Sequence, residues 1–372
     1  MSDFSMANAL RGMADALCHV PPRPKIAFTA LGSELHEDTL VGAAKRVAEH
    51  LIPVIIGPVG IEDFPHFYAE DLPAAHRIME QMLASSAVAG AVTLHYNFPL
   101  GISTVGQIQS VATGRRMILA STTGSSDPRR SAAMVKNAMS GLAMADALGV
   151  VQPTVGLLNV DDAPAAQRLI EKLQEAGFPL RFAQSLRHDG GALMRGNDLI
   201  RGTPDVMVCD TLTGNLLIKL FSAGQSGGDT ETLGCGYGIG LGPGQKSIIG
   251  IISRASGPAT IQQALLFCAQ MARCSIMNHW QDRWRRACEC GIESLLHPPS
   301  PSAQMSPVDC PPRTVLDDEI HGIDILRLDE ARLCLWQAGI FAETGMGCTG
   351  PVLMINHGQR ADALTHLRSF LN

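Results

Sequence analysis

The stretch DVMVCDTLTGNLLIKLF, residues 205–221, decides the fold. It opens with a short apolar run that is typical of a buried strand, and the polar turn TLTG follows directly after Asp210. A helix is predicted to start near Asn215, and Lys219 lies four residues later on the same helix face. A buried strand that leads through a short turn into a helix is the repeating unit of α/β proteins.

The same alternation of strand and helix patterns extends along most of the chain. Apolar or β-branched runs typical of strands are KIAFTALG, PVIIGP, AVTLHY, RMILAST, TVGLLNV, PLRFAQS and SIIGIIS. Between them lie stretches with apolar residues at three- and four-residue spacing, which predict amphipathic helices. Continuous apolar strands alternating with helices indicate parallel sheets that are covered on both faces, so the sequence predicts an α/β fold.

The chain is predicted to have three parts. Residues 1–149 form an N-terminal α/β domain, and residues 150–276 form a second α/β domain that carries the candidate ligand-binding turns. This boundary is placed where a glycine and a proline interrupt the pattern and the strand–helix alternation starts again. Residues 277–372 hold a Pro- and Ser-rich linker, expected over about 280–312, and a C-terminal segment in which the glycine-rich turn ETGMGCTGPV leads into a strand.

Composition excludes several classes of protein. Hydrophobic residues make up 46% of the 372 residues and charged residues 17%, which is enough apolar surface for a large core. The net charge of −6 and the absence of a long basic run argue against a nucleic-acid partner. No apolar run is long enough to span a membrane and the first residues do not resemble a secretory signal, so a cytoplasmic protein without a membrane partner is expected. The ten cysteines are then expected to be free thiols.

No metal and no cofactor are predicted. The glycine-rich stretch GGDTETLGCGYGIGLGPGQ, residues 227–245, lacks the spacing and the preceding strand of a dinucleotide-binding fingerprint. We interpret it as a flexible loop beside a ligand site. The cysteines and histidines between Cys288 and Cys334 do not have the paired spacing that closes a zinc tetrahedron.

Two turns are predicted to bind an anion. In the stretch IISRASG, Ser253 and Arg254 come directly after an apolar strand and before a helix, and arginine is suited to a bidentate grip on phosphate or carboxylate. Thr213, Gly214 and Asn215 occupy the equivalent place in the opening stretch. Ligands of open α/β sheets collect at the carboxyl ends of strands, where the free N–H groups of helix starts attract anions. The alternative is an ordinary turn at each place, capped by Thr213 or Asn215 in the one and with a surface Arg254 in the other.

The stretch GMGCTGP, residues 345–351, is a third candidate. Glycines on both sides of Cys348 allow close approach to a ligand and positive φ angles. Consecutive N–H groups at Gly347, Thr349 and Gly350 would lower the thiol pKa and stabilise an oxyanion on a thioester carbonyl. A buried packing role for the cysteine is the alternative.

These motifs carry a resemblance to a known family. DVMVCDTLTGNLLIK and IISRASG resemble the active-site segments of phosphate acetyltransferases and of the phosphate acyltransferase of phospholipid synthesis. MVKNAMSG, LMRGNDLIRGTPDVMVCDTLTGN, ISRASG and the tail ETGMGCTGPV resemble more closely the alpha subunit of component C of the glycine/sarcosine/betaine reductase complex. The resemblance extends from about Ser121 to the end of the chain, and the tail motif separates this group from plain phosphate acetyltransferases.

The resemblance implies a fold similar to isocitrate and isopropylmalate dehydrogenases, with a cleft between two α/β domains. It implies that an acetyl group becomes a thioester on Cys348 and that inorganic phosphate releases it as acetyl phosphate. It also implies that Ser253, Arg254 and Asn215 lie near the substrate phosphate. The implied partners are a condensing-enzyme-like beta subunit and the selenoprotein of the reductase. His95, at the end of a predicted strand, is either a proton shuttle in this reaction or a structural residue.

Two other functions stay open. The chain could transfer acyl groups between coenzyme A or acyl carrier protein and phosphate without an acyl-cysteine, as its resemblance to phosphate acyltransferases permits. It could also be a non-catalytic scaffold that docks a condensing-enzyme-like partner. Alkylation of Cys348 separates the first of these from the acyl-cysteine hypothesis, and partner binding by an Arg254→Ala variant separates the second.

Overall fold

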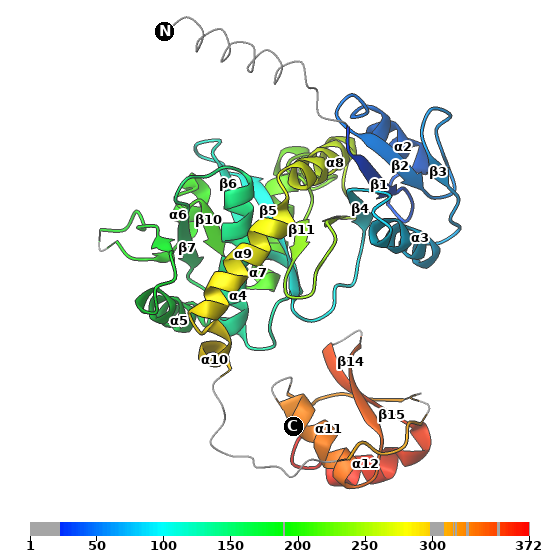
Figure 1. Cartoon of the computed structure of the whole chain (residues 1–372), viewed down its shortest axis with the longest axis vertical. Helices are drawn as coiled ribbons and strands as arrows, with labels where there is room; N and C mark the ends of the chain where they lie inside the picture. The colour runs from blue at the N-terminus through cyan, green and yellow to red at the C-terminus, as the bar shows by residue number, and fades with distance from the viewer. Residues whose placement is uncertain are drawn as a thin grey trace, which may run out of the picture. The chain divides into compact units, whose positions relative to one another are not determined.

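The computed structural model describes residues 23–188, 190–297, 309–314, 316, 318–324, 327–347 and 350–371. The chain divides into two compact units, Met1–Ile292 and Glu293–Asn372, which we call the larger and the smaller unit (Figure 1). Each unit has its own clusters of buried apolar side chains. The two units therefore have separate hydrophobic cores.

The larger unit is built on one twelve-stranded sheet in the order β3-β2-β1-β4-β12-β11-β5-β6-β10-β7-β8, with β9 beside β7. The strands are β1 (Lys25–Thr29), β2 (Ile52–Ile56), β3 (His66–Phe67), β4 (Gly90–Leu94), β5 (Ile102–Gln109), β6 (Arg116–Ser125), β7 (Thr154–Leu158), β8 (Arg181–Phe182), β9 (Leu193–Met194), β10 (Val206–Val208), β11 (Gly238–Leu241) and β12 (Ile249–Ile252). Neighbouring strands run parallel except near the middle of the sheet, where β5 pairs with β6, and β11 pairs with both β5 and β12, in antiparallel fashion. The predicted α/β class with a mainly parallel sheet is therefore confirmed.

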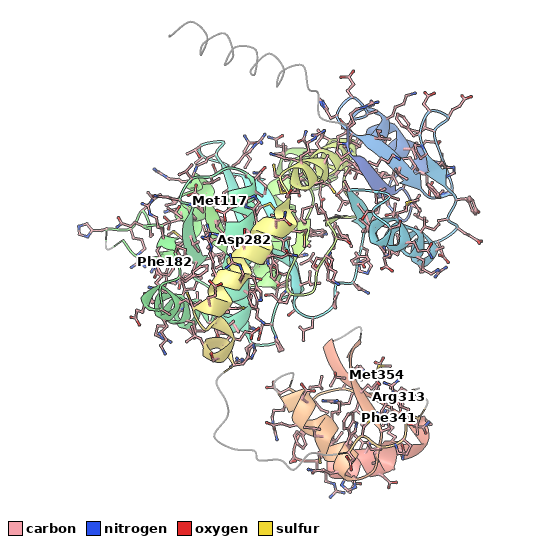
Figure 2. All side chains as sticks on the ribbon, in the orientation of Figure 1. Met117, Phe182, Asp282, Arg313, Phe341 and Met354 are labelled. Carbon is pink, nitrogen blue, oxygen red and sulfur yellow. The ribbon has the colours of Figure 1, made fainter. Side chains whose placement is uncertain are left out.

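Helices cover both faces of this sheet. They are α2 (Glu37–Lys45), α3 (Leu72–Ala84), α4 (Arg130–Ala147), α5 (Ala163–Glu175), α6 (Gly196–Arg201), α7 (Thr211–Ala223), α8 (Pro258–Arg273) and α9 (Ile276–Glu289), together with the short 3-10 helix η1 (Gly224–Ser226). Met117 of β6 packs in one cluster with Ile218 of α7 (Figure 2 labels Met117). A Cβ at Gly141 of α4 would lie 3.3 Å from the side chain of Ala120, also on β6. Because alternate strand residues point to opposite faces, α7 and α4 lie on opposite sides of β6.

Helix α7 starts at Thr211, four residues before the position predicted near Asn215. Asp210 precedes the helix, and its carboxylate accepts a hydrogen bond from the Thr213 N–H at 3.0 Å. An aspartate at this position stabilises a helix start because it satisfies a free N–H group. Asn215 therefore lies inside the helix, and Asp210 is the capping residue, in place of the Thr213 or Asn215 that the alternative interpretation of this turn named.

Residues 280–297, predicted as part of a linker, are mostly helical. They belong to α9, which packs across α4, and to α10 (Ile292–Leu296) (Figure 1). The buried Trp280 of α9 donates from its indole nitrogen to the Ser140 hydroxyl at 3.2 Å, across 140 residues of sequence. The Pro- and Ser-rich composition suggested a linker, and it does not reveal that Trp280 has a hydrogen-bond partner as distant in sequence as Ser140. The linker predicted over residues 298–308 lies outside the described residues.

Strands from both predicted α/β domains share the one sheet. β12 pairs with β4, and α8 packs against α2. Residues 249–273 therefore pack against elements of the predicted first domain, although they are part of the predicted second domain. The observed structure divides the chain once, after Ile292. The predicted boundaries after residues 149 and 276 would divide it into three parts, and they remain predictions.

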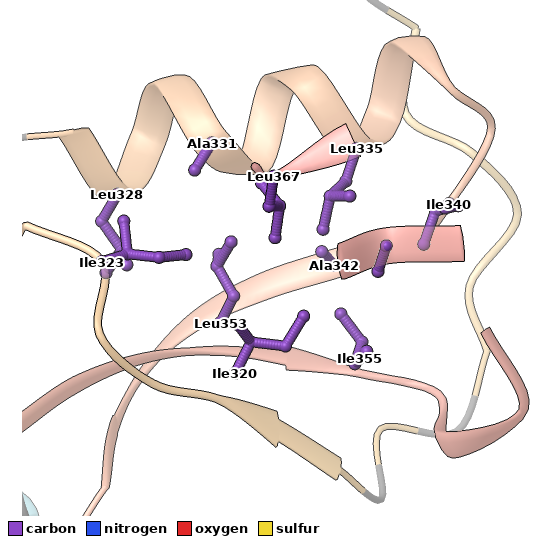
Figure 3. Close-up of a cluster of buried hydrophobic side chains, with 11 residues drawn as sticks. Ile320, Ile323, Leu328, Ala331, Leu335, Ile340, Ala342, Leu353, Ile355 and Leu367 are labelled. Atoms are coloured by element: carbon purple, nitrogen blue, oxygen red, sulfur yellow. The ribbon is translucent and has the colours of Figure 1, made fainter. Parts of the chain in front are cut away.

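The smaller unit contains a three-stranded antiparallel sheet in the order β13-β15-β14. Its elements are β13 (Asp318–Ile320), α11 (Leu328–Gln337), β14 (Ala342–Gly347), β15 (Gly350–Ile355), the 3-10 helix η3 (His357–Gln359) and α12 (Arg360–His366). Leu335 of α11 and Leu353 of β15 are fully buried in its core, beside Leu367 (Figure 3). One face of the sheet is thus covered by helical residues from both sides of the hairpin in the sequence.

The predicted glycine-rich turn before the last strand is itself a strand. β14 pairs with β15 in unbroken register from Ala342 opposite Ile355 to Gly347 opposite Gly350. Strand pairing uses backbone groups, so glycines permit it, but they lack the β-branched and aromatic side chains by which a strand is usually recognised. Cys348, which lies between the two strands in sequence, is outside the described residues.

Candidate anion-binding site

A pocket of about 350 Å³ lies where the chain leaves the carboxyl ends of β4 and β12, and we call it the strand-end pocket. It is lined by Glu34, His95, Tyr96, Asn97, Thr123, Asn215, Lys219, Tyr237, Ile251, Ile252, Ser253, Arg254 and Ala255. Asn215, Ser253 and Arg254, three of the predicted phosphate-binding residues, meet here. The carboxyl ends of strands are where open α/β sheets bind ligands, so the place agrees with the prediction.

The turn between β12 and α8 is held by its own serines and by one distant carboxylate. The Ser253 N–H donates to the Ser256 hydroxyl oxygen at 3.0 Å, and the Ala255 N–H donates to the Ser253 hydroxyl oxygen at 3.1 Å. Ser256 in turn donates to the carboxylate of Glu231 at 2.7 Å, and both residues are buried. Since the Ser253 oxygen accepts from Ala255, its O–H group can still donate to a ligand.

Arg254 is fixed through its backbone, while its side chain is exposed. Its carbonyl oxygen accepts from the Glu34 N–H at 3.0 Å and from the Ser33 hydroxyl at 2.9 Å. Within the part of the chain that the structure describes, the Arg254 guanidinium makes no ion pair. A guanidinium on a fixed backbone that lines a pocket is suited to bind an oxyanion through two hydrogen bonds.

Helix α7 adds an amide and a second cation to the strand-end pocket. Asn215 donates from its side-chain nitrogen to the Thr122 carbonyl at 3.1 Å, which fixes the amide in place. Lys219, one turn later, has its ammonium 6.0 Å from the ring centre of Tyr237. The residues that line the pocket thus include two cations, Lys219 and Arg254, and a single carboxylate, that of Glu34. This balance of charge favours an anionic ligand.

Thr213 and Gly214 do not line the strand-end pocket. The Thr213 hydroxyl donates to the Asp210 carboxylate at 2.5 Å as part of the helix start. A Cβ at Gly214 would lie 1.7 Å from the Ser121 carbonyl oxygen, so this glycine allows α7 to pack directly on β6. The structure gives both residues a role in the start of α7, and their contact with a phosphate remains a prediction.

The predicted residues of the tail belong to the smaller unit. Gly347 and Gly350 lie opposite each other at the ends of β14 and β15. Cys348 and Thr349 are outside the described residues. The roles assigned to these residues in acyl transfer and in oxyanion binding therefore remain predictions.

Several residues of the strand-end pocket were not predicted. Tyr96 and Asn97 follow the end of β4 as Ser253 and Arg254 follow the end of β12, so the same rule of polar residues after an apolar strand could have found them. Glu34, Thr123 and Tyr237 had no such local signal. Tyr237 lies in the stretch 227–245, which was interpreted as a flexible loop beside a ligand site; part of that stretch is instead strand β11, inside the sheet.

Two side-chain hydrogen bonds join α3 to the end of β4, next to the strand-end pocket. His76 of α3 shares a hydrogen bond of 2.9 Å with the Thr93 hydroxyl, and burial lowers the pKa of His76 below its ordinary value. The Tyr96 hydroxyl donates to the Glu80 carboxylate at 2.8 Å. Burial, followed by this bond to Glu80, raises the pKa of Tyr96 to about 12, so the phenol stays protonated at neutral pH. These contacts fix the backbone on both sides of the strand end.

Among the residues that the structure describes, there is no group of three or more histidine, cysteine, aspartate or glutamate side chains that could hold a metal ion. None of the helices in the described ranges is long and apolar enough to cross a membrane.

The chain is similar to several known proteins. Residues 24–354 match the model of a family described as fatty acid synthesis protein. The glycine/sarcosine/betaine reductase complex component C subunit alpha of Peptoclostridium acidaminophilum is 40% identical over 351 residues, which are 92% of this chain and 91% of that protein. A phosphate acyltransferase of Thermus thermophilus is 25% identical over 236 residues, which are 53% of this chain and 70% of that protein. A crystal structure of a branched-chain phosphotransacylase from Enterococcus faecalis has a TM-score of 0.46 at 16% identity and covers 66% of this chain and 98% of its own, a likeness too weak to assign a fold.

The sheet and the strand-end pocket define an α/β protein with a pocket at the carboxyl ends of its strands that is lined by Lys219 and Arg254. The chain belongs to the fatty acid synthesis protein family, whose model covers most of its length. The resemblance to component C alpha subunits and to phosphate acyltransferases is confirmed, and so is the predicted acyltransferase class.

Proposed function

We propose that the chain transfers an acetyl group from a thioester to inorganic phosphate, as the alpha subunit of component C in a reductase complex of the glycine/sarcosine/betaine type. The observation that carries this proposal is the strand-end pocket, where Arg254, Lys219, Ser253 and Asn215 converge from two separate strand–helix connections. The relative of Peptoclostridium acidaminophilum, 40% identical, supports the choice of complex.

Phosphate in this pocket would contact groups that match its charge and its hydrogen-bonding capacity. The guanidinium of Arg254 and the ammonium of Lys219 offset the charge of the dianion, and the Ser253 hydroxyl donates to a third oxygen. A phosphate oxygen then attacks the thioester carbonyl, forming a C–O bond while the C–S bond breaks. The products are acetyl phosphate and the free thiol, and the attacking phosphate loses its proton in the process.

The acetyl group is carried on Cys348 in this proposal. A thiolate is a good leaving group, and N–H groups at Gly347, Thr349 and Gly350 would bind the oxyanion of the tetrahedral intermediate. Support comes from the tail motif ETGMGCTGPV and from the glycines that flank the cysteine in a hairpin. The proposal includes a fold of the isocitrate and isopropylmalate dehydrogenase kind, with a cleft between two domains that admits the acyl-cysteine.

The proposed partners supply the acyl group. In a reductase complex of this kind, a selenoprotein generates the acetyl unit and a condensing-enzyme-like beta subunit works beside the alpha subunit. The printed name of the relative, a component of a reductase complex, supports an assembly with other subunits. Such a complex would operate in the cytoplasm.

A second candidate is transfer between acyl-coenzyme A or acyl carrier protein and phosphate without an acyl-cysteine. The similarity to the phosphate acyltransferase of Thermus thermophilus favours it. It would use the strand-end pocket for the same phosphate, and it differs only in the thiol that holds the acyl group. A test therefore has to ask whether Cys348 is needed.

Isotope exchange makes this test possible with the chain alone. If Cys348 accepts the acetyl group, acetyl phosphate and labelled inorganic phosphate exchange their label without any other thiol. We expect exchange in the wild type, none in Cys348→Ala, and an acetyl adduct on the wild-type tail peptide in mass spectrometry. Cys310→Ala, which removes an exposed thiol, is the control and should exchange normally.

The opposite results would separate the two candidates. An acetyl adduct of full strength on Cys348→Ala would refute the acyl-cysteine. Exchange that appears only after acyl acceptors such as coenzyme A are added, and equally in both proteins, would favour direct transfer.

A further inference from the structure

We propose that His95 accepts the proton that the attacking phosphate releases in the strand-end pocket, a role that rests on the proposed phosphorolysis. His95 is the first residue after β4, and it lines the same pocket as Arg254, Lys219 and Ser253. Its place at the end of a parallel strand puts it where the sheet presents ligands.

The backbone at His95 has an unusual conformation. Its φ angle is +51°, in the left-handed region that non-glycine residues seldom adopt. In the part of the chain that the structure describes, four other non-glycine residues have positive φ: Ser86, Gln152, Asp162 and Ser275. None of these four lines the strand-end pocket. Strained backbone persists where the surroundings enforce it and is concentrated at functional sites, so the φ angle of His95 makes it the candidate functional residue among these five.

The imidazole of His95 has no structural task that would explain its presence. The residue is exposed, and among the described residues its ring makes no hydrogen bond. The nearby His76 is the opposite case, because it is bonded to Thr93 and packs edge-on against Tyr96 at 5.3 Å between ring centres. Burial is the main cause that lowers the pKa of His76, and the charge of His95 is a further one, which places the two rings within electrostatic range.

The charged and titratable groups around His95 come from five elements or the segments beside them. Lys219 reaches the pocket from α7, Arg254 from the turn after β12, and Glu34 from the segment after β1; Tyr237 lines it beside β11, and His76 stands behind it on α3 with Glu80. The two cations have a clear use in binding phosphate. A tyrosine such as Tyr96, whose pKa is raised to about 12, does not exchange its proton near neutral pH. Histidine is the side chain that gains and loses a proton near neutral pH without a shifted pKa.

The reaction needs such a group because a proton changes place. Monohydrogen phosphate, HPO₄²⁻, attacks through one oxygen and ends as the dianion of acetyl phosphate, so it must release its proton. The thiolate that leaves as the C–S bond breaks takes up a proton to become the thiol. A neutral imidazole at His95 accepts the phosphate proton and passes it to solvent, from which the thiolate takes up its own proton, so atoms and charge balance without a further reactant.

The test uses the full-length chain and the exchange of label between acetyl phosphate and inorganic phosphate. His95→Asn is the informative variant because asparagine tolerates the left-handed conformation but cannot relay a proton. His50→Asn is its matched control, since His50 is exposed and does not line the strand-end pocket. Denaturant unfolding of all three proteins checks that the fold is intact.

We expect His95→Asn to exchange about 100-fold more slowly at saturating phosphate, with the KM for phosphate changed by less than about threefold. The wild-type rate of exchange should pass through a maximum with pH. The imidazole of His95 must be neutral when phosphate attacks the thioester, and it must be protonated when the reverse reaction returns the proton to phosphate. The variant should lose that maximum. His50→Asn should match the wild type in rate and in pH profile.

Three results would overturn the proposal, and they can be told apart. If the wild type exchanges label and His95→Asn keeps its rate within about twofold and its pH maximum, the relay is wrong while phosphorolysis stands. If the wild type exchanges no label although inorganic phosphate binds to it, the proposed phosphorolysis through an acyl-cysteine is itself wrong and the relay is wrong with it. A loss that appears only as a raised KM for phosphate would make His95 a binding residue, which also contradicts the relay.

Discussion

The turns that follow β10 and β12 have the same local plan but different roles in the structure. Each comes after a buried strand and leads into a long helix, and each was predicted to bind an anion. After β10, the Asp210 carboxylate accepts hydrogen bonds from the backbone and the hydroxyl of Thr213, so the polar groups of the turn satisfy one another. After β12, the guanidinium of Arg254 stays exposed and lines the strand-end pocket.

The difference lies in what holds each turn. The β12 turn is held from outside by the buried Glu231, which binds Ser256, which in turn binds the backbone of Ser253. Because this support does not use the side chain of Arg254, that side chain is available for a ligand. A polar turn at a strand end therefore keeps a side chain available for a ligand when another part of the chain satisfies its backbone.

The largest expected effect comes from Gly214, where the β10 turn meets the sheet. Gly214→Ala would place a Cβ 1.7 Å from the Ser121 carbonyl oxygen, and a backbone atom cannot move aside as a flexible side chain can. Overpacking of this kind costs about 3 kcal/mol or more, so we expect a large loss in the free energy of unfolding, measured with urea. If Gly214 instead serves phosphate alone, the variant keeps its stability and loses only phosphate affinity.

A matched control is available in another helix. Gly42 lies inside α2, and a Cβ there would meet no atom within 4 Å. Gly42→Ala should stabilise the protein by up to about 1 kcal/mol, because alanine is the better helix former. The two variants together separate close packing from helix propensity.

Local pattern was enough to predict much of this architecture. The alternation of apolar strands and helices predicted the α/β class, and the polar residues directly after an apolar strand pointed to Ser253 and Arg254, which line the strand-end pocket. These signals are local, because they depend on a run of about ten residues. Gly214 was predicted to bind phosphate, which stays a prediction; the structure shows that this glycine also allows the close approach of Ser121, which no spacing in the sequence reveals.

The missed features depend on contacts between distant segments. The partner of Trp280 in α9 is Ser140, and the partner of Ser256 is Glu231. Neither pair leaves a pattern in either segment, so α9 was predicted as linker and Glu231 was not considered. The hairpin of the smaller unit was missed for another reason, because glycine-rich strands lack the side chains by which strands are recognised.

A smaller effect is expected when the support of the β12 turn is removed. Ser256→Ala leaves the Ser253 N–H without its acceptor and the Glu231 carboxylate without its donor, both in a buried place. An unsatisfied buried group costs about 2 kcal/mol, which urea unfolding would detect. Because the turn then no longer positions Arg254, we expect the Kd for inorganic phosphate, measured by calorimetry, to rise about tenfold, equivalent to about 1.4 kcal/mol.

An exposed serine provides the control for that variant. Ser85 donates to the Gln81 carbonyl at the end of α3, and Ser85→Ala should change stability by less than about 0.5 kcal/mol and leave phosphate binding unchanged. A loss of stability in Ser256→Ala with an unchanged Kd would show that Arg254 is positioned by other contacts, such as those of its carbonyl to Glu34.

The smallest effect tests the β10 turn as a cap rather than an anion site. Asp210→Ala removes the acceptor for the Thr213 N–H and should reduce stability by about 1 kcal/mol, whereas Asp210→Asn, which can still cap, should lose less. In both variants the Kd for phosphate should stay within about twofold, because Asp210 does not line the strand-end pocket. A strong gain in phosphate affinity on removal of this carboxylate would mean that the anion binds at the β10 turn, and the contrast between the two turns would then be wrong.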